Sequence, residues 1–188
     1  FHGLYLKRLN LEYTQKILGF QNIFPDLIVR MGPFKSMKYP KFEAVCSTIL
    51  PKLIGTYEME LANIIEDVKN KSYETIIDIG CAEGYYAVGF AMTTSNAQII
   101  AYDIDPDARE LCLEMAKLNL VEDKIIIKDG IDENLLIAEV QGKRALVLSD
   151  CEGFETELFT KKSIPALKNC DLLIETHDFY NINISKNL

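Results

Sequence analysis

After residue 55 the chain alternates short apolar runs with amphipathic segments, and this alternation constrains the fold more than any other feature. The apolar runs are nearly continuous in Ile, Leu and Val, as in strands that are buried on both faces. Strands that alternate with helices form a parallel sheet with helices on both sides. We therefore predict an α/β fold, a three-layer, doubly wound and mostly parallel sheet, whose first strand is central and lies beside the fourth. The predicted strands are residues 74–79, 98–103, 124–128, 144–149 and 171–176.

Helices are predicted between these strands from the spacing of apolar residues and from capping signals. Residues 84–92, 106–118 and 133–140 show the helical pattern, and Asp105 stands where a cap is expected. An earlier helix is expected to begin at Thr56, which can cap it. Its inward-facing residues would be Leu61, Ile64, Ile65 and Val68.

The chain divides near Gly55 into two regions. Residues 1–55 are predicted to form an N-terminal extension of helical and irregular structure, and residues 56–188 the α/β domain. Within the extension, residues 11–18 show a short helical pattern. Residues 32–40 contain glycine and proline breakers and are predicted to form a loop. A loop of this kind is either a lid over a site or a packed surface loop, and we expect the packed loop.

Composition excludes several classes of protein. The formal net charge is −8, and the adjacent basic pairs, such as Lys7-Arg8 and Lys161-Lys162, are short. Nucleic-acid binding needs clustered Lys and Arg, so we expect no nucleic-acid partner. The five cysteines are widely spaced and include no CxxC pair, which indicates reduced thiols in a cytoplasmic protein. No apolar run has membrane-spanning length and no signal-peptide core occurs at the start, so we expect no membrane partner.

The first predicted strand runs into a turn with the spacing GxxxG. Gly80 permits a sharp turn, and Gly84 would let a ligand approach the start of the next helix. The dinucleotide fingerprint GxGxxG, which receives a pyrophosphate, is absent. Carboxylates would repel a pyrophosphate but suit a ligand with an ammonium and a sulfonium, such as S-adenosylmethionine; a plain tight turn is the alternative. The candidate cofactor-binding residues here are Asp78, Gly80, Cys81, Ala82, Glu83, Gly84 and Tyr85.

Two further strand ends are acidic. Asp103, with Ile104 after it, stands about 20 residues beyond the glycine turn, where a ribose diol is bound in folds of this kind. Asp129 and Gly130 follow the third strand, where an acid could bind an adenine amino group. An ordinary Asp-Gly turn explains that pair equally well.

These strand ends resemble, in order, the cofactor motifs of class I S-adenosylmethionine-dependent methyltransferases. The stretch Asp150-Cys151-Glu152-Gly153-Phe154-Glu155 further resembles the DxEGxE signature of the FkbM-like methyltransferases. The resemblance implies a Rossmann-like methyltransferase fold and S-adenosylmethionine as cofactor, with Asp150 also near the cofactor. A complete fold of this class has seven strands, so we expect a sheet truncated after its fifth strand, or an edge covered by N-terminal residues.

The fourth and fifth strands are neighbours in such a fold, so their ends would meet over the methyl group. We expect Asp150, Glu152 and His177 to be catalytic, with Glu175 and Asp178 beside them. His177 would act as general base, although a structural histidine is an equal alternative. The cluster could also bind Mg²⁺ or Mn²⁺, but we assign no metal ligand. Positioning alone is a further possibility.

The expected function is S-adenosylmethionine-dependent O-methylation of a hydroxyl on a small molecule or glycan. One alternative is a non-catalytic S-adenosylmethionine-binding module, whose motifs would look the same. The other is a nicotinamide-dependent oxidoreductase, which the missing GxGxxG disfavours. The sequence does not specify the acceptor or the oligomeric state.

Overall fold

The computed structural model describes residues 23–177, so the predicted helical pattern at residues 11–18 lies outside the described part. The sheet is parallel, with five strands in the order β3-β2-β1-β4-β5. The predicted α/β fold, with the first strand central and beside the fourth, is confirmed. The strands are β1 Thr75–Ile79, β2 Gln98–Tyr102, β3 Ile125–Lys128, β4 Ala145–Ser149 and β5 Asp171–Ile174.

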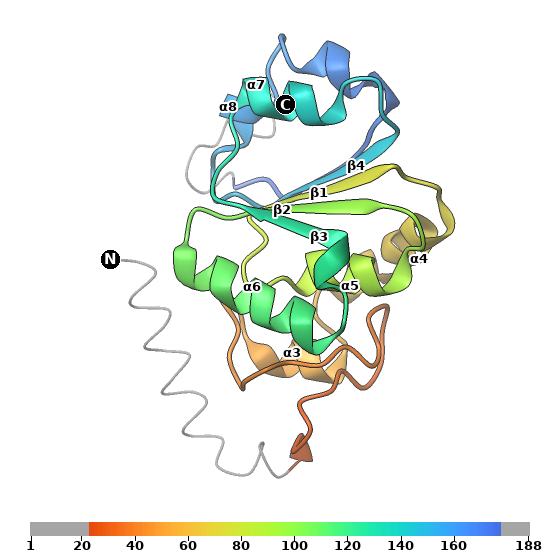
Figure 1. Cartoon of the computed structure of the whole chain (residues 1–188), viewed down its shortest axis with the longest axis vertical. Coiled ribbons are helices and arrows are strands. Elements are labelled where there is room, and N and C mark those ends of the chain that lie inside the picture. The colour runs from red at the N-terminus through yellow and green to blue at the C-terminus, as the bar shows by residue number, and fades with distance from the viewer. Residues whose placement is uncertain (1–22, 178–188) are drawn as a thin grey trace.

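Helices cover both faces of this sheet and give the three predicted layers (Figure 1). One face is covered by α3 to α6, and the other by α7 and α8. Short 3-10 turns occur at Met59–Leu61, Glu122–Lys124 and Ile164–Asn169. The helices are α3 Ile49–Ile54, α4 Ala62–Asn70, α5 Tyr85–Thr93, α6 Pro106–Leu118, α7 Glu133–Val140 and α8 Glu155–Leu158.

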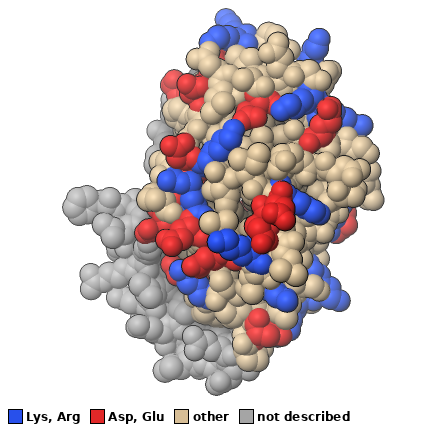
Figure 2. All heavy atoms as spheres, in the orientation of Figure 1, with Lys and Arg blue, Asp and Glu red and all other residues tan. Residues whose placement is uncertain are grey.

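The surface carries both signs of charge. On the face shown in Figure 2, Lys and Arg side chains are interspersed with Asp and Glu side chains. Among the described residues no helix is both long and apolar enough to cross a membrane. All five cysteines are free thiols.

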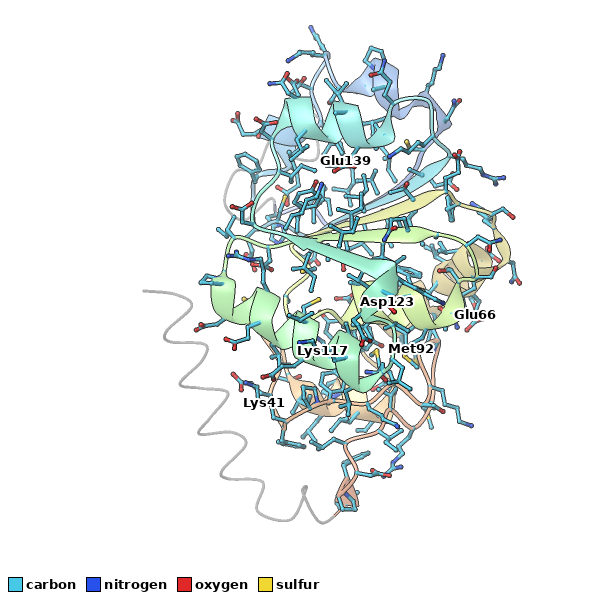
Figure 3. All side chains as sticks on the ribbon, in the orientation of Figure 1. Lys41, Glu66, Met92, Lys117, Asp123 and Glu139 are labelled. Carbon is cyan, nitrogen blue, oxygen red and sulfur yellow. The ribbon has the colours of Figure 1, made fainter. Side chains whose placement is uncertain are left out.

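Alternation along the strands divides the core into two clusters. Ile76 and Leu146 point into the cluster beneath α5 and α6, and Ile77 and Val147 into the one beneath α7. Side chains fill the space between the sheet and the helices (Figure 3). Glu139 of α7 accepts hydrogen bonds from the Tyr102 hydroxyl (2.9 Å) and from Lys128 Nζ (2.5 Å). These contacts join α7 to β2 and β3.

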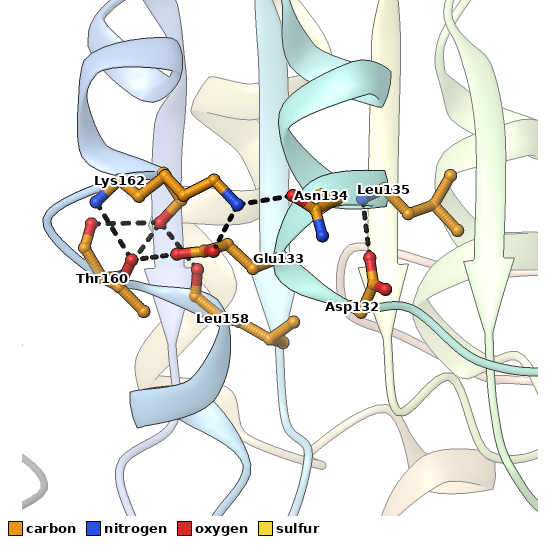
Figure 4. Close-up of polar contacts among 8 residues, drawn as sticks. Asp132, Glu133, Asn134, Leu135, Leu158, Thr160 and Lys162 are labelled. Atoms are coloured by element: carbon orange, nitrogen blue, oxygen red, sulfur yellow. Dashed lines mark hydrogen bonds and ion pairs between the residues drawn. The ribbon is translucent and has the colours of Figure 1, made fainter.

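Side-chain caps fix where two of the helices begin. The carboxylate of Asp105 accepts a hydrogen bond from the N–H of Asp107 (2.9 Å), which confirms it as the cap of α6. Asp132 caps α7 by accepting from the N–H of Leu135 (2.8 Å) (Figure 4). Lys162 Nζ donates to Glu133 of the same helix (3.0 Å), which ties α7 to the segment after α8.

The predicted cap at Thr56 is wrong. The N–H of Thr56 donates to the carbonyl of Pro51 (2.8 Å), so Thr56 completes the end of α3 instead of starting a helix. Glu58 has a left-handed backbone (φ 45°), and α4 begins only at Ala62. Ile64 consequently faces outward with 45% exposure.

The predicted loop at residues 32–40 packs against the domain. Phe34, Met37 and Tyr39 are each at most 3% exposed and belong to the same core cluster as α5 and α6. Phe34 lies so close to Gly89 of α5 that a Cβ there would meet its ring at 2.6 Å. The packed-loop expectation is confirmed, and the described part of the extension shares the core of the domain.

Candidate functional site

The carboxyl ends of β1, β2 and β4 meet at one edge of the sheet. Chain order reverses between β1 and β4, which is where ligands bind in open parallel sheets. Ile79 pairs with Tyr102 on one side and with Ser149 on the other. The residues that follow these strands, among them the predicted Gly80, Asp103 and Asp150, therefore stand side by side at this edge.

The turn after β1 depends on left-handed backbone at Gly80 (φ 82°), Ala82 (φ 49°) and Gly84 (φ 93°). A Cβ at Gly80 would lie 1.8 Å from the carbonyl oxygen of Asp150. A Cβ at Gly84 would lie 2.7 Å from Cys112 Sγ of α6. The two glycines thus allow the turn to close against β4 and α6, whereas we had expected Gly84 to make room for a ligand.

Asp103 links the ends of β1 and β2. Its Oδ2 accepts from the N–H of Ala82 (2.8 Å) and its Oδ1 from the N–H of Asp105 (2.9 Å). Each carboxylate oxygen keeps a second lone pair, so Asp103 can still accept hydrogen bonds from a diol. Ile104, the next residue, is 88% exposed and offers an apolar surface beside it.

Asp78 is a buried carboxyl group at the end of β1. It is 1% exposed, and within the described part of the chain neither oxygen has a hydrogen-bond partner of ordinary geometry. Burial, reinforced by the charge of Asp150, raises the pKa of Asp78 to about 7, although the Ala87 amide acts in the opposite direction. A buried carboxylate is costly unless a cation or donor compensates it. The ammonium of S-adenosylmethionine would supply that charge, so Asp78 fits the predicted cofactor.

Three other predicted cofactor residues of the turn face inward. Glu83 is fully buried and contacts Lys52 and the segment before α3. Cys81 and Tyr85 are each 4% exposed. The structure therefore places these side chains in the core beneath the turn, away from its open side.

The end of β3 forms a simple turn. The carboxylate of the exposed Asp129 accepts from the N–H of Gly130 (2.9 Å). A Cβ at Gly130 would meet nothing within 4 Å. The ordinary Asp-Gly turn accounts for this pair, and its predicted contact with adenine stays a prediction.

The three predicted catalytic residues come together at the ends of β4 and β5. His177 Nε2 lies 3.3 Å from Asp150 Oδ1 and 3.9 Å from Glu152 Oε2. His177 is 4% exposed, while Glu152 stands at the rim with 56% of its side chain exposed. Asp178, expected beside them, lies outside the described residues.

Two carboxylates of this site were missed by sequence reasoning. Glu155 is fully buried, and its Oε1 lies 2.6 Å from His177 Nδ1. The third acid of the Asp150–Glu155 signature was its signal. Glu58, in the loop before α4, acts on both Asp150 and Glu175 through its charge. Its sequence position gave no sign of this, because a tertiary contact brings that loop to the edge of the sheet.

Closely spaced carboxylates shift the pKa values of Asp150 and His177. Burial, followed by the charge of Glu175, raises the pKa of Asp150 to about 6. Burial alone would lower the pKa of His177, but the hydrogen bond and charge of Glu155, together with the charge of Asp150, outweigh it and raise the pKa. Asp150 is thus a stronger base than an ordinary carboxylate, and His177 holds its proton more firmly than an exposed imidazole.

The same group could hold a divalent cation. Ligand atoms of Asp150, Glu175 and His177 all lie within 4.8 Å of one another. Carboxylates with one imidazole suit Mg²⁺ or Mn²⁺, and Glu155 would orient the imidazole. Our assignment of no metal ligand stays a prediction.

Comparison with known proteins identifies a family. The family model of the TRM5/TYW2 methyltransferase domain matches residues 56–183. The release factor glutamine methyltransferase of Clostridium botulinum is 26% identical over 87 residues, covering 46% of this chain and 30% of that protein. The ribosomal protein L11 methyltransferase of Bacillus licheniformis is 29% identical over 99 residues, covering 53% and 30%. The chain thus spans under a third of the length of these relatives.

The prediction that no nucleic acid is a partner is contradicted. A solved structure that resembles this chain is the complex of aTrm5 and tRNALeu, with 26% identity, a TM-score of 0.38, and coverage of 59% of this chain and 30% of that one. It bears the name of the family that matches residues 56–183. Net charge is a weak guide to such a partner because it sums over the whole chain, whereas Lys and Arg side chains are interspersed with Asp and Glu side chains on the face shown in Figure 2.

The nicotinamide-dependent oxidoreductase and the non-catalytic module, which the sequence had left open, are not supported by these relatives. The matched family model and both curated relatives are those of methyltransferases. The chain belongs to the TRM5/TYW2 methyltransferase domain family.

Proposed function

We propose that this methyltransferase acts on a hydroxyl group of its acceptor and that Asp150 takes up the proton of that hydroxyl. The observation that carries this proposal is the position of His177 between the buried Glu155 (2.6 Å) and Asp150 (3.3 Å). Asp150 also follows the strand beside β1, close to the turn that would hold the methyl donor.

The cofactor contacts follow from the sheet edge. S-adenosylmethionine supplies a methyl group on a sulfonium, which an acceptor oxygen can attack. We infer that Asp78 compensates its positive charge, that Asp103 accepts hydrogen bonds from the ribose hydroxyls and that Ile104 and Asp129 flank the adenine. The open lone pairs of Asp103 and the unpartnered oxygens of Asp78 support this assignment. Glu83, which faces the core, is left out of it.

Proton uptake is assigned to Asp150 because His177 is the poorer base in this setting. Carboxylates at both ring nitrogens favour the protonated form of His177 and raise its pKa. It then donates from Nε2 toward Asp150 Oδ1, which leaves Oδ2 of Asp150 for the hydroxyl proton. A pKa near the working pH favours general-base catalysis, and the pKa of Asp150 is raised to about 6.

The acceptor we propose is a small molecule or glycan that carries the hydroxyl. A tRNA is a second candidate, favoured by the matched family. Asp150, Glu152 and Glu175 surround the reacting position, so the phosphates of an RNA acceptor would have to lie outside this rim. Both candidates offer hydroxyl groups.

Finer assignments are also proposed here. The signature from Asp150 to Glu155 supports an FkbM-like subgroup, although the family model that matches is TRM5/TYW2. Free thiols at all five cysteines are consistent with a cytoplasmic location. The division of the chain at residue 55 and the truncation of the sheet after β5 stay predictions.

The proposed function is tested by incubating the protein and methyl-labelled S-adenosylmethionine with separate pools of tRNA, glycans and small hydroxyl compounds. Base treatment then separates stable methyl ethers from labile methyl esters. Label in an ether of any pool supports hydroxyl methylation, and the pool identifies the acceptor class. Label found only on nitrogen or carboxyl groups contradicts it.

A further inference from the structure

The side chain of Glu83 holds the glycine turn from its core side. Glu83 is fully buried. Its carboxylate accepts hydrogen bonds from Lys52 Nζ (2.5 Å), from the N–H of Val45 (2.9 Å) and from the Tyr39 hydroxyl (3.3 Å). Tyr39 and Lys52 are each only 3% exposed. The turn is therefore anchored from beneath, through a carboxylate that does not reach its open side.

On the open side the same turn is bound to Asp103. The N–H of Ala82, the residue before Glu83, donates to Asp103 Oδ2 (2.8 Å). The N–H of Asp105 donates to Asp103 Oδ1 (2.9 Å). These two amides fix the plane of the Asp103 carboxylate and hence the direction of the lone pairs that are left for a diol. A rotation of the Ala82 amide would redirect them.

The backbone of Ala82 is left-handed (φ 49°), which is a strained conformation for a residue with a Cβ. Such a conformation persists only where the surrounding structure fixes it. Two contacts do so here, because Asp103 binds the N–H of Ala82 and the buried partners of Glu83 hold the residue that follows. If the anchor at Glu83 is lost, Ala82 can relax and its amide can turn away from Asp103.

The ion pair of Lys52 and Glu83 is suited to fix one arrangement of this turn. Its two side chains are 3% and 0% exposed. The ammonium of Lys52 also lies over the rings of Tyr57 (4.6 Å) and Tyr85 (5.3 Å). Buried ion pairs often stabilise a fold no better than apolar residues of similar size, and their best-attested use is to fix one arrangement. The pair thus matters for the geometry of the turn more than for the stability of the fold.

We propose that Lys52 and Glu83 are positioning residues for the cofactor, which from the core side hold Ala82 in the conformation that orients Asp103 toward the ribose. The inference rests on the proposed ribose contact of Asp103 and is independent of the acceptor. It assigns no contact between the ion pair and the ligand. Loss of the pair should therefore weaken cofactor binding only while the carboxylate of Asp103 is present.

A double-mutant cycle tests this route. Lys52→Met/Glu83→Gln removes both charges, so that neither is left buried without its partner. By calorimetry it should bind S-adenosylhomocysteine about ten times more weakly than the parent, because a misdirected carboxylate loses about one hydrogen bond to the ribose. In the background of Asp103→Ala, the same two substitutions should cause no further loss. Lys71→Met/Asp171→Asn is the matched control, since it removes an exposed ion pair (2.8 Å) before β1 and at the start of β5, and it should bind as the parent does.

Amide hydrogen exchange, followed by NMR, gives a readout that needs no ligand. In the free Lys52→Met/Glu83→Gln variant, the N–H of Ala82 should exchange about ten times faster than in the parent. The N–H of Ile77, in the middle of β1, should keep its parent rate. An unchanged rate at Ala82, or the same acceleration at both positions, overturns the proposal, because the latter reports a general loss of stability.

The binding outcomes are distinct as well. Parent affinity in the folded Lys52→Met/Glu83→Gln variant, or an equal loss with and without Asp103, overturns the positioning role and leaves the ribose contact intact. Parent affinity in Asp103→Ala refutes the ribose contact itself, and the positioning role with it. If the variant without the ion pair does not fold, Tyr39→Phe takes its place, since it removes only the longest of the three hydrogen bonds to Glu83. Binding about three times weaker, with no loss in the Asp103→Ala background, is then expected, and parent affinity overturns the proposal.

Discussion

The imidazole of His177 is anchored by a carboxylate that is completely shielded from water: Nδ1 lies 2.6 Å from Oε1 of Glu155. Glu155 accordingly acts through His177 as a positioning residue. Glu155→Gln keeps the shape of the side chain but removes the charge that keeps His177 protonated. We expect turnover to fall by about one to two orders of magnitude, since a hydrogen bond to a charged group contributes about 1.5 to 3 kcal/mol.

The readout that separates this role from a structural one is a comparison of kcat with cofactor affinity. S-adenosylhomocysteine binding by calorimetry should be unchanged in Glu155→Gln while kcat falls. Glu157→Gln, two residues along the same helix and exposed, is the matched control and should behave as the parent. A parallel loss of cofactor affinity and kcat in Glu155→Gln would show that the pair only holds the fold.

Turnover should depend on the ionisation of Asp150. Its pKa is raised to about 6, so below that pH the carboxyl is protonated and cannot accept the hydroxyl proton. We predict that kcat rises about tenfold per pH unit up to about pH 6 and then levels. Asp150→Asn should bind the cofactor normally and lose about two to four orders of magnitude in kcat. If kcat does not rise in this way with pH, a group other than Asp150 takes up the proton.

The ionised carboxylate of Asp78 should destabilise the folded state and strengthen cofactor binding. Its pKa is raised from 3.8 to about 7, so the folded state binds the proton more tightly than the unfolded state does. The resulting destabilisation is absent below about pH 4 and grows to about 4 kcal/mol by about pH 8. Asp78→Asn removes the charge, so the variant should gain stability over the parent as pH rises. Its affinity for S-adenosylhomocysteine should fall by about one to two orders of magnitude.

Urea unfolding at several pH values, beside calorimetry, measures both effects of Asp78→Asn. If the stability difference between variant and parent is the same at about pH 4 and about pH 8, the carboxyl is not held neutral by burial. Cofactor affinity unchanged by Asp78→Asn would mean that this carboxyl does not face the ligand.

Chelation distinguishes two roles for the cluster of Asp150, Glu175 and His177, a catalytic base and a metal site. If Asp150 alone takes up the proton, dialysis against EDTA leaves kcat unchanged. Loss of turnover with EDTA and recovery with Mg²⁺ or Mn²⁺ would instead assign the cluster to a cation, whose possible ligand atoms lie within 4.8 Å of one another. A mock-dialysed sample is the control.

Local pattern was sufficient to predict the sheet. Each strand is a nearly continuous apolar run, and the caps at Asp105 and Asp132 depend on residues two or three positions away. The start of α4 was mispredicted because Thr56 is drawn to the carbonyl of Pro51 at the end of α3. Capping competes with such contacts, and the sequence does not show which contact is stronger.

The sequence predicts those site residues that directly follow strands. It does not reveal those whose role depends on contacts with residues distant in the chain. Asp103, Asp150 and His177 follow predicted strands, and the sheet brings them to one edge. Gly80 and Gly84 are required because of Asp150 and Cys112, which no local pattern reveals. Val45 and Lys52 bind Glu83 from more than 30 residues earlier in the chain, so sequence spacing could not indicate these contacts.

The central claim is that S-adenosylmethionine binds where β1 and β2 end, with its ribose on Asp103. Calorimetric titration of S-adenosylhomocysteine into the parent, Asp103→Ala and the exposed control Asp123→Ala tests it most directly. We predict binding to the parent and the control, and an affinity about one to two orders of magnitude lower for Asp103→Ala. Equal affinity for all three proteins, or no binding to the parent, would contradict it.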